Sequence, residues 1–536
     1  MYMKTNLMLL LILAVVISLL TACGRGREGP DEPQPTPDRE VALTIRWGYG
    51  AGRGTTLPET SPDAELVQIT SSRFGVSIVP VLTRGGYDVS NPPDIFVTYD
   101  PHLLLASGVI REIPLDFLAT FAPQYYGLRT SAPFGMDVGR GLEPNSAIGL
   151  KQYLGGTGNL VFYSAYRLDW LEEHGILPAG IVVPLDDGRV YFTDTPFTYH
   201  QFLEIMRAFS SSDRRNGLAV FEDVERLHNI AQLMGMWGLN LSIVNDNGQP
   251  NYYFASPRYK SFLQFMSTMY AEGLINLIGR HVTGTTAAGM RLGVVPGGPE
   301  IGWFQVHWNI LGPNQPAMEV LNRRPEARLL ITPPEIGPYL DSGVGGLGTV
   351  LPYNPARMWV IGAQVSDEKL AAILQIFEYI TFDTEAFVLT SVGIAGDHFE
   401  WAGEPYNSLI VRDANMTNRA LRSGAFVLHT FINLAERDIF FLGDNAVIRY
   451  SSSPMGRDAV IPPHREDVFG DFALQYAALT AQYGRELFRI RQSFFSSAIR
   501  GEIDIDAMWD WYIDELHNNG LLQFLDLVEQ FPVVGP

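Results

Sequence analysis

The chain has 536 residues, of which 46% are hydrophobic, 12% aromatic and 18% charged, so it can bury two or three cores and is not mainly disordered. Its 38 basic and 58 acidic residues give a net charge of −20, which opposes contact with the phosphates of a nucleic acid. The single cysteine excludes a disulfide framework and any metal site built from several thiolates.

The N-terminus has the pattern of a secretory signal. Lys4 precedes an apolar run, residues 7–20, whose length of about 14 residues is short for a membrane-spanning helix. The run ends in Leu-Thr-Ala-Cys at Cys23, the only cysteine. This ending resembles the lipobox of bacterial lipoproteins, in which cleavage leaves the cysteine first in the chain with a diacylglyceryl group on its sulfur. The resemblance implies a signal peptide at 1–22 and a lipid anchor at Cys23. The alternative is an ordinary signal peptide or a short membrane anchor with an incidental cysteine.

Residues 23–40 predict a disordered tether, because they contain four prolines and no large apolar side chain. The chain beyond the tether alternates between strand and helix patterns, which favours βαβ units and a mostly parallel sheet. We expect strands at 41–47, 76–82, 94–99, 159–163 and 358–363. We expect helices at 63–74, 168–174, 198–209, 258–272, after Ser366, and at 507–519, with N-caps at Thr198 and Ser366 and a hairpin turn at 245–248.

Motifs of catalysis are weak. Gly343–Gly348 matches G-x-G-x-x-G, but Pro352 and Pro355 prevent the helix that a dinucleotide site requires, so a loop joining two parts of the fold is favoured. Residues 246–248 resemble a calcium loop that lacks the glutamate at its twelfth position. The sequence has neither H-E-x-x-H nor G-x-S-x-G. We therefore assign no catalytic residue, metal ligand or cofactor, although a bound metal and a pair of glycosidase carboxylates brought together by folding both stay open.

Aromatic residues beside polar ones indicate carbohydrate binding, because sugars stack their C–H faces on rings and present hydroxyl groups to carboxylates and amides. Tyr99 and Asp100 follow an expected strand, at the end where ligands approach an α/β sheet. The other candidate ligand-binding residues are Trp237, Trp303, Trp308 and Trp401. For each tryptophan the alternative is packing in a core.

Several segments, in this order, resemble the family 1 extracellular solute-binding proteins of ABC importers, in particular the lipid-anchored LplA-like branch of Gram-positive bacteria. They are the lipobox at Cys23, then Pro93–Phe96, Leu105–Asp116, Tyr166–Gly175, Tyr270–Asn276, Val392–Glu400 and Gly501–Tyr512. Residues 179–195, 281–300 and 413–480 depart from the pattern. These departures weaken the assignment of a ligand from the resemblance more than the assignment of a fold.

The resemblance implies an α/β protein with the two-lobed, periplasmic-binding-protein type II-like fold and a ligand cleft between the lobes. One lobe would comprise 41–155 and 325–395, and the other 156–324 and 396–536. The protein would be a monomer without enzyme activity, lipid-anchored on the extracellular face of the cell membrane. It would capture a small solute, an oligosaccharide or sugar derivative, and deliver it to ABC permease subunits. The alternatives are a surface enzyme acting on polysaccharide and a sensory sugar-binding module without transport.

Overall fold

The computed structural model describes most of the chain after residue 42. The described residues are 43–50, 60–83, 88–131, 135–151, 156–157, 162–178, 180, 182–185, 188–210, 215–224, 230–239, 243–246, 248–279, 300–307, 316–338, 358–401, 403–405, 410–411, 414–425, 427–428, 460–461 and 469–531. Within them, no helix is both long enough and apolar enough to cross a bilayer. Cys23 and the expected signal peptide and tether lie outside the described residues.

The first of two larger sheets has the strand order β2-β1-β3-β20-β4, and β7 also pairs with β20. Its strands are β1 (Thr44–Tyr49), β2 (Ser77–Leu82), β3 (Ile95–Thr98), β4 (Ile110–Arg111), β7 (Gly149–Lys151) and β20 (Met358–Gly362). β1 runs parallel to β2 and β3, as the βαβ pattern predicts, whereas β20 runs antiparallel to β3, β4 and β7. The expectation of a mostly parallel sheet is therefore wrong here, because β20 reaches the sheet from a remote part of the chain rather than through a single crossover helix.

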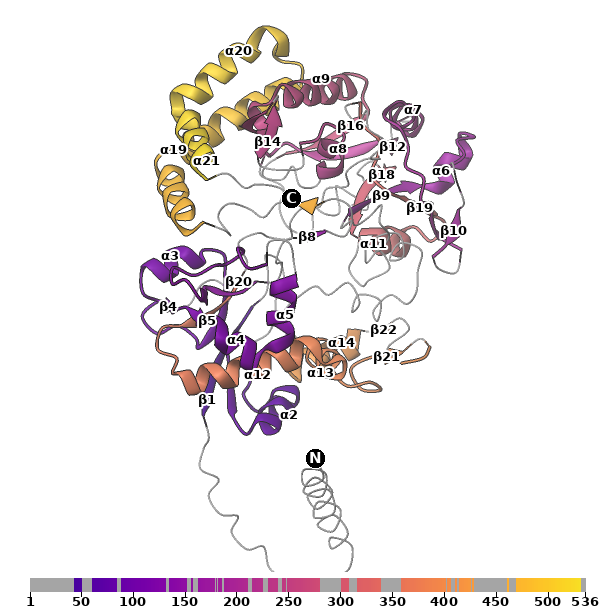
Figure 1. Ribbon diagram of the computed structural model, residues 1–536. Coiled ribbons are helices and arrows are strands. Elements are labelled where there is room, and N and C mark those ends of the chain that lie inside the picture. The colour runs from indigo at the N-terminus through magenta and orange to yellow at the C-terminus, as the bar shows by residue number, and fades with distance from the viewer. Residues whose placement is uncertain are drawn as a thin grey trace, which may run out of the picture. The chain divides into compact units, whose positions relative to one another are not determined.

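Helices from two separate stretches of the chain, 65–131 and 367–391, belong with the first sheet. They are α2 (Glu65–Phe74), α3 (Pro101–Ala106), α4 (Leu115–Phe121), α5 (Pro123–Ser131), α12 (Asp367–Phe382) and α13 (Thr384–Ser391), which packs on α12. Figure 1 shows α12, coloured orange, close to the indigo strands and α2. Its face with Ile373 and Phe377 shares a buried cluster with Trp47 and Trp359 of the sheet. Ser366 caps α12 by accepting the N–H of Lys369, which confirms the expected cap.

The second larger sheet has the order β10-β11-β19-β9-β18. Its strands are β9 (Phe162–Arg167), β10 (Val183–Pro184), β11 (Val190–Phe192), β18 (Trp303–His307) and β19 (Leu329–Thr332). Only β11 and β19 are parallel, and β9 is antiparallel to both of its neighbours. This sheet is therefore mixed, as is the first.

A large aromatic core packs on one side of the second sheet. Its helices are α6 (Leu168–Glu173), α7 (Tyr199–Phe209), α8 (Ala231–Gly235), α9 (Pro257–Ala271), α19 (Gly470–Ile499), α20 (Ile505–Leu516) and α21 (Leu522–Gln530), with a 3-10 turn at Tyr253–Ala255 and a π turn at His517–Leu521. The expected cap of α7 is confirmed: Thr198 and Gln201 form a reciprocal capping box. Helix α11 (Pro316–Arg323) packs instead on a separate cluster over β11 and β19.

Short ladders complete the described structure. They pair β5 (Ile113–Pro114) with β6 (Ser146–Ala147), β8 (Gly156–Thr157) with β23 (Val460–Ile461), β12 (Arg215–Asn216) with β17 (Glu300–Ile301), β13 (Leu218–Phe221) with β16 (Ile275–Ile278), β14 (Ile243–Asp246) with β15 (Gln249–Tyr252), and β21 (Glu400–Trp401) with β22 (Ile410–Val411). The β14–β15 pair is the hairpin expected around 245–248. Ala420 of α14 (Ala414–Arg422) packs with Leu66 of α2.

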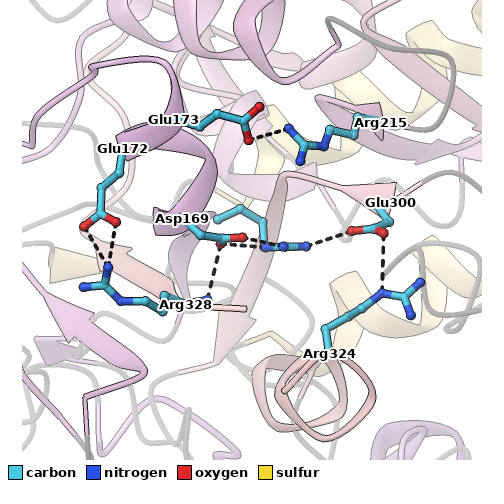
Figure 2. Close-up of polar contacts among 8 residues, drawn as sticks. Asp169, Glu172, Glu173, Arg215, Glu300, Arg324 and Arg328 are labelled. Atoms are coloured by element: carbon cyan, nitrogen blue, oxygen red, sulfur yellow. Dashed lines mark hydrogen bonds and ion pairs between the residues drawn. The ribbon is translucent and has the colours of Figure 1, made fainter. Parts of the chain in front are cut away.

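A network of ion pairs holds the C-terminal end of β9 to its neighbours (Figure 2). Arg167, whose side chain is 5% exposed, donates from Nε to Asp169 Oδ1 at 2.8 Å and from Nη1 to Glu300 Oε2 at 3.1 Å. Burial opposes the charge on Arg167, but these carboxylates outweigh it and raise its pKa. The guanidiniums of Arg167 and Arg215 both lie over the ring of Trp170, at 4.6 and 4.5 Å from its centroid.

Replacing Arg167 with Met should destabilise the protein by about 1.5–3 kcal/mol, because Asp169 and Glu300 would keep their charges without their shared donor. Urea unfolding measures the change. Arg489→Gln is the matched control, since that arginine pairs with Glu486 at the surface, and its unfolding midpoint should equal that of the wild type. Equal midpoints for all three proteins would contradict a structural role for the network.

Candidate ligand-binding site

Three adjacent strands of the first sheet have a terminus at the same end of the sheet. β3 ends at Thr98 and β7 ends at Lys151, while β20 lies between them and begins at Met358. The register pairs Met358 with both Thr98 and Lys151, so these three residues form a row across the sheet. Ligands of α/β proteins bind beyond the carboxyl ends of the strands. This row, which we call the edge row, is therefore the candidate ligand-binding site.

Tyr99 and Asp100 continue the chain directly beyond the edge row. Tyr99 is 39% exposed and Asp100 is also exposed. Thr98 Oγ1 accepts the N–H of Asp100 at 3.1 Å, which orients the turn into α3. Asp100 occupies the N-cap position of α3, but its carboxylate makes no capping bond and has no partner among the described residues. A ring and a carboxylate are thus available together at this edge, while their role in binding stays a prediction.

A buried polar layer from α5 lies under the edge row. The Tyr125 hydroxyl accepts the N–H of Lys151 at 2.7 Å and donates to its carbonyl at 3.2 Å, which ties α5 to the end of β7. Burial raises the pKa of Tyr125, and the neighbouring Arg129 charge opposes that rise. Glu378 of α12 caps the start of α5 by accepting the N–H groups of Gln124 and Tyr125. Glu378 and Tyr125 therefore hold α5 against the end of β7 in the edge row.

Trp237 and Trp303 lie within the aromatic core of the second sheet. Trp237 is 3% exposed and contacts the rings of Phe262 and Phe265, with centroids 5.5 and 4.7 Å away. Trp303 is 2% exposed and meets Phe202 edge to face at 5.9 Å. For these two residues the burial favours the core-packing alternative.

The other sequence-predicted residues are not brought together with the edge row by any described contact. Trp401 is half-buried in β21 and meets Phe399 edge to face at 5.2 Å. Trp308 lies outside the described residues, as does the glycine-rich segment 343–348. The structure thus leaves the two residues after β3 as the exposed pair among the sequence-predicted candidates that it describes.

Sequence reasoning missed a buried carboxyl group beyond the end of β19. Glu335 is fully buried, and its Oε1 accepts hydrogen bonds from Ser164 Oγ at 2.6 Å, from Trp303 Nε1 at 2.9 Å and from the hydroxyl of Tyr166. Burial raises the pKa of Glu335, although the hydrogen bonds from Ser164 and Tyr166 act in the opposite direction. The sequence offers one signal, a single acidic residue within the apolar stretch 329–337, and this signal is not specific.

A pocket of about 570 Å³ lies between the β14–β15 hairpin and helix α20. Its polar lining consists of Asp246, Gln249, Asn251, Asp510, Asp514 and His517. Trp509 also lines it, but this ring is mostly buried against Phe494 and Tyr512, which limits the face available for stacking. Sequence reasoning interpreted 507–519 only as a helix with an apolar stripe. No described group of three or more His, Cys, Asp or Glu side chains could hold a metal ion.

Comparison with protein families and with curated proteins finds no match to the sequence. Solved structures do match over nearly their whole length. The alginate-binding protein AlgQ2, without calcium ion, gives a TM-score of 0.55 at 15% identity and covers 92% of this chain and 98% of its own. A solute-binding protein from Bifidobacterium longum infantis, described as HMO-binding and associated with an ABC transporter, gives 0.59 at 12% identity, covering 91% and 98%. FusA from Streptococcus pneumoniae, an ABC-transporter substrate-binding protein in complex with kestose, gives 0.54 at 15% identity, also covering 91% and 98%.

The chain has the fold of the extracellular solute-binding proteins. This confirms the mixed α/β, two-lobed fold class expected from the sequence. At these identities the match concerns the solute-binding fold and not the ligand. The division of the chain between lobes stays a prediction. Residues 329–332, expected in the same lobe as 41–155, form β19 of the second sheet. Ala420, expected in the other lobe, packs on α2 beside the first sheet.

If Trp237 belongs to the core of this solute-binding fold, Trp237→Ala should destabilise it by about 3–5 kcal/mol, the usual result of removing a buried tryptophan. Trp511→Ala is the control, because Trp511 is 51% exposed on α20 and its loss should change stability little. Urea unfolding of both variants provides the comparison. A small effect at Trp237 together with weaker ligand binding would restore the binding role.

Glu335→Gln should change how stability depends on pH. Because the folded protein binds the Glu335 proton more tightly than the unfolded chain does, the carboxyl group favours folding at low pH. This contribution is lost as pH rises from the ordinary value of 4.5 through the raised value of the folded state. The free energy of unfolding of the variant, relative to wild type, should therefore increase with pH across that window. Urea unfolding at several pH values tests this, with the exposed Glu326→Gln as control, and parallel pH profiles for variant and wild type would refute it.

Proposed function

We propose that this chain is the extracellular solute-binding component of a carbohydrate ABC importer. It captures an oligosaccharide or sugar derivative, releases it chemically unchanged to the permease subunits, and carries no catalytic residues. The observation that carries this proposal is the exposed pair Tyr99 and Asp100 beyond the edge row, a ring beside an unengaged carboxylate, in a solute-binding fold.

The neighbours' ligands support the carbohydrate part of the proposal. FusA is described in complex with kestose, and the Bifidobacterium protein is described as HMO-binding. Those ligands belong to those proteins. For this chain we propose only the same class of ligand, carbohydrate, because sugar recognition needs aromatic and carboxylate groups such as those beyond the edge row.

We further propose that each larger sheet, with the helices packed on it, forms one lobe, and that the solute sits between the lobes. Closure then follows from better contacts of the solute with the closed state than with the open one. The lipobox-like ending at Cys23 supports attachment of the protein to the outer face of the cell membrane through a lipid. The protein acts as a monomer in this proposal.

A thermal-shift panel of neutral and acidic oligosaccharides, run on the mature wild-type protein, tests the function. A ligand at 100 times its Kd should stabilise the fold by about 2.7 kcal/mol. Asp100→Asn should weaken that ligand by roughly 10- to 100-fold, since it removes a charged hydrogen-bond acceptor. Asp526→Asn, at an exposed acid of α21, should bind like wild type.

Two outcomes would contradict the proposal. No shift with any saccharide would remove the carbohydrate assignment, and recovery of cleaved sugar after incubation would favour the surface enzyme. Uptake of the same sugar is then measured in cells that lack this protein. Loss of uptake indicates an importer and unchanged uptake indicates a sensory module, because only an importer is needed for the sugar to accumulate.

A further inference from the structure

Among the described residues, Arg129 of α5 is a buried cation without a paired anion. The residue is fully buried, its Nη2 donates to the carbonyl of Met136 at a long 3.3 Å, and the hydroxyl of Tyr125 is a further polar neighbour. Its Nε and Nη1 atoms have no acceptor in the part of the chain that the structure describes. No described carboxylate lies within ion-pair distance of this guanidinium, in contrast to Arg167.

Arg129 cannot avoid the cost of a buried charge by becoming neutral. An arginine stays charged in proteins, so it cannot lose its proton when buried as a lysine can. Buried charges are ordinarily paired with an opposite charge, because an unpaired one loses its hydration without compensation. The surroundings of Arg129 therefore lack one component, an anion that accepts from its free nitrogen atoms.

The neighbours of Arg129 place this missing anion at the edge row. Arg129 acts electrostatically on the hydroxyl of Tyr125, which is already occupied by the backbone of Lys151. Its Nη1 lies 4.0 Å from the position where a Cβ of Gly139 would stand, and that position is in contact with Met358 of the edge row.

We propose that Arg129 receives the carboxylate of an acidic sugar, so that the solute is a uronate-containing saccharide. This inference rests on the proposed function and specifies its ligand class. A guanidinium matches a carboxylate in charge and in hydrogen-bond donors. The net charge of −20 repels anions at long range, so selection for the acidic sugar must come from this contact.

Burial of Arg129 defines how the contact works. Since the guanidinium has no exposed surface, the carboxylate is enclosed with it, and the absence of water strengthens their attraction. The solute therefore enters before the surrounding segments close, as in a fold that functions by enclosing its ligand.

The test compares trigalacturonic acid with its fully methyl-esterified form, which lacks the charges and carries one added methyl group on each carboxyl, by calorimetry on the mature protein. Wild type should bind the acid roughly 10- to 100-fold more tightly than the ester. Arg129→Gln should abolish this preference and leave binding of the ester unchanged. Arg140→Gln, at an exposed arginine of the same segment, should keep it.

Every other outcome contradicts the inference. Equal binding of acid and ester, or a preference that persists in Arg129→Gln, would overturn it and leave the binding function intact. Thermal protection by inorganic phosphate through Arg129, without protection by any uronate, would assign the site to a different anion. Failure of all saccharides, neutral ones included, would count against the proposed function itself.

The measurement does not depend on the stability of one variant. Should Arg129→Gln fail to fold, Arg129→Lys keeps the charge but removes the planar set of donors, and it should lower the preference several-fold. In the wild type alone, added salt should keep or increase the preference for the acid, because salt screens the long-range repulsion by the net charge of −20 and barely screens an enclosed ion pair. A preference that disappears at high salt would refute the contact.

Discussion

The insertion of β20 between β3 and β7 is the pairing on which the candidate site depends. All five residues of this strand are buried, and its antiparallel register aligns Met358 with Thr98 and Lys151. More than two hundred residues separate β20 from its partner β7, so the pairing must offset the entropy of closing a very long loop. It does so through burial on both faces and through α12, which follows at once and packs Phe377 against Tyr125. Without β20, Met358 would not align Thr98 with Lys151, and the edge row would not exist.

This arrangement separates two uses of aromatic side chains that look alike in the sequence. Trp237 and Trp303 are surrounded by other rings, so their apolar surfaces are already buried, and Trp303 also gives its N–H to Glu335. Tyr99 instead leaves a large part of its surface outside at the end of a strand. Composition shows that rings are abundant, whereas the position of a ring relative to a strand end decides whether a solute can reach it.

Local patterns in the sequence predicted local structure well. The strand at 76–82, the caps at Thr198 and Ser366 and the hairpin at 245–248 all depend on neighbouring residues, and the structure confirms them. The antiparallel partners of β9 and β20 were not predictable in this way, because strand direction is set by where a distant segment returns. The same limit hid the buried side chains of Glu335 and Arg129. The sequence around a charged residue does not show whether a partner from a distant segment will lie beside it in the fold.

The two buried arginines show what such a partner changes. Arg167 lies over the ring of Trp170, Arg129 neighbours the hydroxyl of Tyr125, and both guanidiniums are almost or wholly excluded from water. Around Arg167, Asp169 and Glu300 supply carboxylates from two different elements, so the charge is neutralised by the chain itself and serves to hold β9, α6 and β17 together. Around Arg129 the described residues supply no carboxylate, only the carbonyl of Met136 at 3.3 Å and the neighbouring hydroxyl of Tyr125. An acidic chain with 58 carboxylates could readily have placed one beside it. Since the described structure neutralises one buried guanidinium and leaves the other open, the anion that we propose at α5 and the edge row explains the difference, whereas the stability of the fold does not.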